Sequence, residues 1–305
     1  MGDDDPSLSG EVSPRLRLNI SIENITTETN AIVGAKRLDR KMRGGAQAHL
    51  IEADNGHYYV VKFRNNPQHR RILLNEWVAG MFLRCLGITT PDTAVIDLSE
   101  EFLQKSPDVC IRLGSNKVRV EPGRHFGSAY PGAPDRDCVY DFLPDVLLDN
   151  VVNLSEFLGV LAFDKWAANT DSRQSIFYRL KRGAASGGED LVRKAFVVSM
   201  IDHGSVFDGG HWTYADSPLQ GLYFRPLVYM NVRSFEDFQP WLDRIVHFPS
   251  NVVDDALKQV PAEWLDGDDG ALNDLLTRLM ARCNRVPDLI RESTRGRVNP
   301  FPNWK

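Results

Sequence analysis

Two short strand-like runs place stronger limits on the fold of this chain than any other sequence feature. Residues 175–179 and 195–201 are rich in aromatic and β-branched side chains, which favour strands. A link rich in glycine, alanine and charge, residues 182–194, joins them. If the runs pair as an antiparallel hairpin, Asn169 before the first and Asp202 after the second leave the ladder at the same end. One metal ion would then be within reach of both side chains.

Asp164 is a third polar side chain in this part of the sequence. It follows an apolar run, residues 157–163, that predicts a buried helix opening into a polar loop. An Asp that accepts a hydroxyl proton, with an Asn five positions later as a metal ligand, is a pattern of phosphoryl transfer. The Asp–Asn spacing and the sequence Asp202-His203-Gly204 are each common in ordinary turns, so their combination is the informative signal.

A second group of candidate residues lies upstream. Residues 47–53 and 57–63 are strand-like runs on either side of an Asn-Gly dipeptide, a strong hairpin signal. Gly44 and Gly45 precede the first run. Small residues at this point let backbone amides approach a phosphate closely. The pattern therefore predicts a hairpin with a phosphate-binding turn before it.

Lys62 lies on the returning strand among apolar neighbours, where an unpaired ammonium is costly. Residues 68–86 have the apolar spacing of a helix, with Gly87 as a stop signal, and Glu76 falls within it. We expect Glu76 to pair with Lys62, which would aim the lysine at nucleotide phosphates. The alternatives are a surface lysine that extends to solvent and a solvated glutamate.

Taken in order, these motifs resemble those of the HipA-like kinases. The resemblance covers roughly residues 30 to 210 and is carried by Gly44-Gly45, the strand with Lys62, Asn75-Glu76-Trp77, residues 164–171 and residues 201–204. Comparable Asn-Thr-Asp and Ile-Asp-(Asn/His)-Gly sequences occur in phosphatidylinositol 4-kinases. The resemblance implies an α+β, two-lobed protein-kinase-like fold, with a β-rich N-lobe and a mainly helical C-lobe.

The resemblance also implies an ATP- and Mg²⁺-dependent phosphotransferase with defined residue roles. Asp164 would be the catalytic base, Lys62 the phosphate-binding lysine with Glu76 as its partner, and Asn169 and Asp202 the magnesium ligands. Nucleotide binding would also involve Gly44, Gly45 and a connector at residues 118–123, which contains Glu121. The chain departs from ordinary protein kinases in having a short glycine loop, no His-Arg pair before the catalytic Asp, and His203, which we interpret as structural.

The domain boundaries follow from composition and spacing. We expect a disordered leader at residues 1–14, an N-lobe at 15–122 and a C-lobe at 123–305. Helical spacing at 235–247, 252–259 and 271–283 supports a helical C-lobe. Trp212, Tyr214, Tyr223 and Phe224 are interpreted as core aromatics, with substrate recognition as the alternative.

Composition limits the partners of the chain. A formal charge of -5 over 305 residues argues against nucleic acid as the main partner. The basic run at residues 36–43 is a solvated face or, alternatively, attracts phosphates. Four widely spaced cysteines and no membrane-length apolar stretch predict a cytoplasmic protein without a membrane span. The oligomeric state is left open by the sequence.

The acceptor is the least determined part of this prediction. Likeness to HipA-like kinases favours a protein Ser/Thr hydroxyl, and the lack of a basic membrane-binding helix argues against an inositol lipid. A small-molecule acceptor, AMP transfer from an inverted nucleotide, and a catalytically silent nucleotide-binding module remain alternatives.

Overall fold

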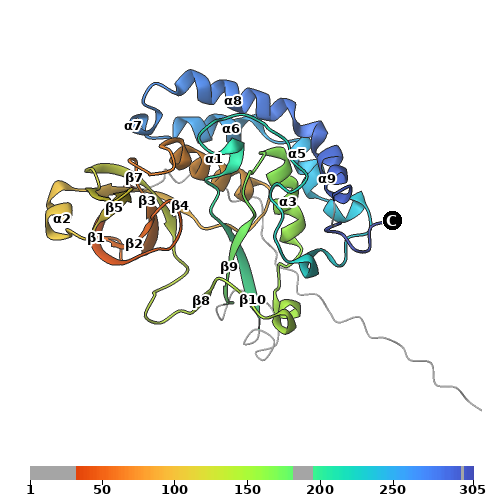
Figure 1. The fold of residues 1–305 in the computed structure, drawn as a ribbon, viewed down its shortest axis with the longest axis horizontal. Helices are drawn as coiled ribbons and strands as arrows, with labels where there is room; N and C mark the ends of the chain where they lie inside the picture. The colour runs from red at the N-terminus through yellow and green to blue at the C-terminus, as the bar shows by residue number, and fades with distance from the viewer. Residues whose placement is uncertain (1–31, 181–194, 297–298) are drawn as a thin grey trace, which may run out of the picture.

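The computed structural model describes residues 32–180, 195–296 and 299–305 (Figure 1). The predicted leader at 1–14 and the link at 182–194 lie outside the described residues. The described part contains a β-barrel near the start of the chain and a larger helical part that holds its second half (Figure 1). The α+β class is therefore as expected.

Five strands close the barrel in the order β1-β2-β3-β7-β4. Neighbouring strands are antiparallel except for β1 and β4, which pair in parallel. Their bounds are β1 (Ile32–Lys41), β2 (His49–Ala53), β3 (Tyr58–Lys62), β4 (Thr93–Leu98) and β7 (Gly123–Ala129). The predicted Asn-Gly turn joins β2 to β3, where Gly56 has a φ of 78°, a conformation that glycine adopts without steric cost.

The barrel extends beyond the predicted N-lobe boundary. Strand β7 pairs with β3, with Phe126 opposite Lys62, and with β4 on its other side. The predicted N-lobe limit at 122 is therefore wrong, because the chain leaves the barrel only after Ala129. The sequence signal for strand β7 is weak. Its buried residues His125 and Phe126 lie between two glycines, which are uncommon inside strands.

The predicted nucleotide connector at 118–123 is also wrong. Part of it, β6 (Asn116–Arg119), instead pairs with β5 (Cys110–Leu113) in a separate two-stranded sheet, after the short helix α2 (Glu100–Lys105). Glu121 has a side chain that is 61% exposed and forms an ion pair with Arg64. It therefore lies on the surface before the last barrel strand, and the chain returns to the barrel after it.

The second predicted hairpin is confirmed. Strands β9 (Gln174–Arg179) and β10 (Phe196–Ile201) pair antiparallel, with Gln174 opposite Ile201 at one end. The short strand β8 (Val139–Tyr140) extends this sheet on the β9 side. The hairpin brings the residues just before β9 close to Asp202.

Helices make up the rest of the described chain. Helix α1 (Arg71–Cys85) lies between the barrel and the helical part, where it contacts β7, α6 and α7, and helix α3 (Glu156–Trp166) contacts α5 and α9 (Figure 1). The remaining elements are η2 (Asp145–Asn150), η3 (Val206–Asp208), η4 (Pro226–Tyr229), η5 (Phe235–Phe238), α5 (Trp241–Val246), α6 (Ser250–Lys258), α7 (Ala262–Leu265), α8 (Asp269–Ala281), η6 (Cys283–Arg285) and α9 (Val286–Thr294). The helix expected at 235–247 is interrupted at Pro240, which cannot continue a helix.

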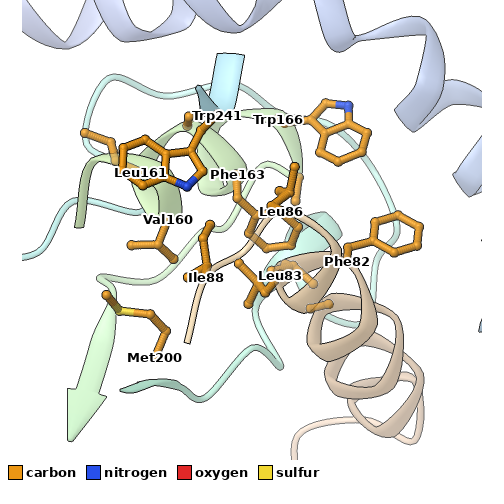
Figure 2. Packing of buried hydrophobic residues seen from close by; sticks show 14 of the residues in the cluster. Phe82, Leu83, Leu86, Ile88, Val160, Leu161, Phe163, Trp166, Met200 and Trp241 are labelled. Atoms are coloured by element: carbon orange, nitrogen blue, oxygen red, sulfur yellow. The ribbon is translucent and has the colours of Figure 1, made fainter. Parts of the chain in front are cut away.

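The largest core joins α1 to α3. Figure 2 shows Phe82 and Leu83 from α1, and Leu86 directly after it, facing Val160, Leu161, Phe163 and Trp166 from α3, with Met200 and Trp241 at the edge of the cluster. All of these side chains are buried. The core fixes α1, which carries Glu76, against α3, which carries Asp164. Within the described residues, no helix combines the length and apolarity needed to cross a membrane.

The space around Gly159 shows that α3 is tightly packed against α5. A Cβ at this position would lie 2.5 Å from the indole of Trp241, whereas a Cβ at Gly270 in α8 would meet nothing within 4 Å. We expect Gly159→Ala to destabilise the protein by about 1–3 kcal/mol through overpacking, less the helix-propensity gain of about 1 kcal/mol. Thermal unfolding measures the effect. Gly270→Ala is the control and should be neutral or stabilising; a Gly159→Ala protein with an unchanged or higher Tm would contradict this packing.

Candidate active site

Lys62 is the centre of a buried group of charges. Its Nζ pairs with Glu76 Oε1 from α1 and donates to Asp202 Oδ1 at 2.7 Å. Burial opposes the charge of Lys62, but the two carboxylates prevail and raise its pKa above the usual value. Burial also opposes the charge of Asp202, but Lys62 holds the pKa of Asp202 below its usual value. The predicted Lys62–Glu76 pair is therefore present, and the lysine also binds Asp202.

Asn75, next to Glu76, fastens α1 to the turn that follows Asp202. Its Nδ2 contacts the carbonyl oxygens of Gly204, Val206 and Gly209 at 2.7, 3.0 and 2.9 Å. Its Oδ1 accepts from Trp212 Nε1 at 2.8 Å. Trp212 is buried, as expected for a core aromatic. Because Asn75 and Glu76 are neighbours in one helix, this contact sets the position of Glu76 relative to Asp202.

Asp164, the predicted base, is fully buried at the end of α3. Its Oδ2 accepts from Arg173 Nε at 2.9 Å, and its Oδ1 pairs with Arg173 Nη2. Asn169 Nδ2 donates to the same Oδ1 at 3.0 Å. Neither side chain of the ion pair has any exposed surface. The sequence reasoning missed Arg173, because the partner of a buried carboxylate is not visible in local spacing.

Asn169, the predicted metal ligand, lies in the interior of the loop between α3 and β9. The residue is buried, its Nδ2 is engaged by Asp164, and its Oδ1 accepts from the Asp171 backbone N–H at 3.2 Å. Both ends of the amide are therefore used to hold the loop between α3 and β9. The hairpin pattern in the sequence predicts where the chain goes, but it does not specify which side chains face outward.

Arg173 also reaches the turn around Asp202. Its Nη1 donates to the Ile201 carbonyl oxygen and contacts His203 Nδ1, both at 2.9 Å. Burial and then Arg173 hold the pKa of His203 well below its usual value, so the ring is neutral. Its Nδ1 accepts from Arg173, and Nε2 lies 2.9 Å from Thr90 Oγ1, which donates to Met200. His203 is the structural residue that the sequence indicated.

Asp171 is an exposed carboxylate beside this network. Its backbone N–H is held by Asn169, and its carbonyl oxygen accepts from Gly221 N at 3.2 Å. A pocket of about 450 Å³ is lined by Thr170, Asp171, Ser172, Ala215, Asp216, Ser217, Leu219, Gln220 and Phe224. The sequence signal was present in Asn169-Thr170-Asp171, but the role of base had been assigned to Asp164.

Asp202 is the carboxylate that remains accessible at the open end of the hairpin. Its side chain is 39% exposed even though it binds Lys62. Gln174, also exposed, is the β9 residue paired with Ile201, directly before Asp202. Asp202 and Gln174 are both exposed at this end of the hairpin, whereas Asn169 is buried. Carboxylate and amide oxygens are ligands suited to Mg²⁺.

The charges near Lys62 fit a divalent cation. Two cations, Lys62 and Arg173, contact three carboxylates: Glu76, Asp202 and Asp164. Among the described residues no three His, Cys, Asp or Glu side chains converge on one point. Mg²⁺ in phosphoryl-transfer sites uses one or two carboxylates together with phosphate oxygens, so it needs no such cage.

Gly44 and Gly45 lie in the turn between β1 and β2. Gly44 has a φ of 119°, which disfavours any other residue there. The basic run before them is largely a solvated face, as expected: Lys36 and Arg37 pair with Glu52, and Arg40 pairs with Asp39. The turn itself remains a candidate for phosphate binding.

Comparison with known proteins gives a family match. A family model described as HipA-like kinase matches residues 36–288. No curated protein matches the sequence.

Similar solved structures include two of a Golgi casein kinase. One, described as having Mn/ADP bound, is 12% identical, with 90% of this chain and 77% of that chain covered and a TM-score of 0.47. The other is 14% identical, with 90% and 75% covered and a TM-score of 0.48. A hydra Fam20 with sugar is 13% identical, with 94% and 93% covered and a TM-score of 0.49.

The Arg173–Asp164 pair should be essential for stability. Arg173→Met leaves a carboxylate buried without its partner, so we expect a loss of about 3–5 kcal/mol in the free energy of unfolding. Denaturant unfolding measures it. Arg37→Met, which removes an exposed ion pair with Glu52, is the matched control and should change stability little. Asp164→Leu in the Arg173→Met background should recover part of the loss. Similar losses for Arg173→Met and the control would refute the assignment.

Proposed function

The chain belongs to the HipA-like kinase family and is a kinase by that membership, and we propose that it transfers the γ-phosphoryl group of ATP, with Mg²⁺, to a Ser or Thr hydroxyl of a protein. In this proposal the β-barrel and the helical part are the two lobes of a protein-kinase-like fold. The observation that supports it best is the convergence of Lys62, Glu76 and Asp202 from β3, α1 and the end of β10.

Lys62 would bind the α- and β-phosphates of the nucleotide. A lysine held by a helix glutamate is the arrangement that phosphotransferases of this architecture use. The Lys62 ammonium is positively charged and preorganised by two carboxylates, so it loses little conformational freedom when phosphate oxygens arrive. The backbone of the turn at Gly44 and Gly45 would cover the phosphates from the barrel side.

Asp202 would hold the magnesium ion, and Gln174, exposed at the same end of the hairpin, would be a second ligand. When bound, the metal offsets negative charge on the transferring phosphoryl group. Arg173 holds the residues on both sides of Asp202, because its Nη1 contacts the Ile201 carbonyl oxygen and the His203 ring. The position of Asp202 is therefore fixed by its neighbours, while its carboxylate stays exposed to solvent.

Asp171 would take the proton from the acceptor hydroxyl. It is the exposed carboxylate of the loop before β9, and it lines a pocket able to admit a side chain. Asp164 then serves as a positioning residue, because it orients Asn169 and Asn169 holds the Asp171 backbone. In this proposal the base is Asp171, which solvent reaches, and not the buried Asp164.

Labelled ATP tests the proposed function. We expect the purified protein, incubated with a cell lysate and Mg²⁺, to transfer label to Ser or Thr of proteins from ATP labelled at the γ-phosphate. Label at the α-phosphate should not be transferred. Mass spectrometry identifies the modified residues. Transfer of the α-label would indicate AMP transfer, and ATP binding without any transfer would indicate a silent nucleotide-binding module; either result contradicts the proposal.

The two aspartates should behave differently when changed. Asp171→Asn should lower kcat by at least about a hundredfold, the usual contribution of a general base, while the affinity for ATP stays within a few-fold. Asp164→Asn should lower the Tm as well as the turnover, because it breaks a buried ion pair. Asp288→Asn, which removes an exposed carboxylate on α9, is the control. The roles are reversed if Asp171→Asn keeps full turnover while Asp164→Asn loses it without any change in Tm.

A further inference from the structure

Exposed apolar side chains gather in two segments of this protein. The four most exposed large apolar residues of the described chain are Val146 at 84%, Phe224 at 75%, Phe142 at 62% and Leu219 at 60%. Leaving such side chains in water forgoes the gain from burying them, and a cluster of them marks an interaction site. We refer to these four residues as the acceptor surface.

The two segments meet through Arg225. Its Nε donates to Asp145 Oδ1 at 2.9 Å, which ties the residue after Phe224 to the residue before Val146. Its guanidinium also lies over the ring of Phe142, with Cζ 4.6 Å from the centroid. Phe142, Val146 and Phe224 therefore belong to segments that a buried arginine holds together, although about 80 positions separate these segments in sequence.

The acceptor surface continues into the pocket of Asp171. Leu219 and Phe224 line that pocket together with Asp171 itself. One wall of the pocket is held in place by Lys165, whose Nζ donates to the carbonyl oxygens of Ser217 and Pro218 at 3.2 and 2.8 Å. A polypeptide that inserts a hydroxyl toward Asp171 would thus lay its flanking residues on fixed apolar side chains.

The border of the surface is acidic. Residues 135–149 contain five aspartates and one arginine, and Asp141 and Asp149 are exposed on either side of Phe142 and Val146. Such a border attracts basic groups. It repels the anionic head groups of a membrane, and it would face its own acidic border in a symmetric dimer. A basic polypeptide is the occupant that this chemistry favours.

We propose that the acceptor is a protein segment that carries bulky apolar and basic side chains next to the Ser or Thr that receives phosphate, and that it docks on the acceptor surface. This inference rests on the proposed function and names its substrate class. The apolar side chain packs against Phe224 and Leu219 beside the pocket, and the basic residues face Asp141 and Asp149.

Defined peptides test the proposal. The probes are a serine peptide with leucine and arginine flanks, a version with alanine in place of leucine, and a version with glutamate in place of arginine. We expect each replacement to raise KM by about tenfold or more with a smaller effect on kcat, since flanking contacts contribute mainly to binding. Phe224→Ser and Phe142→Ser should remove the preference for leucine. Leu113→Ser, a similarly exposed residue on β5, should keep it.

Peptide binding read by fluorescence anisotropy separates this inference from the proposed function. If peptides bind with a preference for leucine but receive no phosphate, the proposed function is overturned. The bound segment is then not a phosphate acceptor. Transfer with equal KM for the leucine and alanine peptides overturns the acceptor surface alone. Two further results would also overturn the acceptor surface. One is a concentration-dependent dimer in sedimentation velocity that Phe224→Ser abolishes. The other is binding to phosphatidylserine vesicles that Phe224→Ser abolishes.

Discussion

The buried ion pair between Arg173 and Asp164 is the contact on which the rest of the site depends. Arg173 joins the end of α3 to the open end of the β9–β10 hairpin, and it contacts the residues on both sides of Asp202, at the Ile201 carbonyl oxygen and the His203 ring. A guanidinium has five N–H donors in a planar fork, so one side chain can satisfy a carboxylate, a carbonyl oxygen and an imidazole nitrogen together. The cost of burying it is offset only while all of these partners are present.

The site combines side chains that are buried and anchored with carboxylates that are exposed. Lys62, Glu76 and Asn75 are anchored to the barrel and α1, and Asn75 extends that anchoring to the turn after Asp202. Asp171 and Asp202 are exposed, while the buried Asn169 and Arg173 bind the backbone at Asp171 and Ile201. This division explains how two carboxylates can be exposed and well placed at the same time.

Local patterns in the sequence predicted the elements well. The Asn-Gly turn, the strand with Lys62, the helix with Glu76 and the hairpin that ends at Asp202 are all present, since each has a short-range signal of periodicity or turn chemistry. The Lys62–Glu76 pair was also predictable, because a charge among apolar neighbours requires a partner. The barrel strand at Gly123–Ala129 was missed, because its two glycines resemble a loop and its pairing is entirely non-local.

The sequence by itself determined which chemical groups this protein has and the order in which its strands and helices present them. Only the tertiary structure decided which of those groups reach solvent. Asp164 and Asp171 are seven positions apart and equally acidic as sequence, yet one is sealed by Arg173 and the other lines a pocket. Likewise Phe142 and Phe224 form one surface only because Arg225 connects their segments. Burial depends on contacts between distant segments, and a local sequence pattern does not specify those contacts.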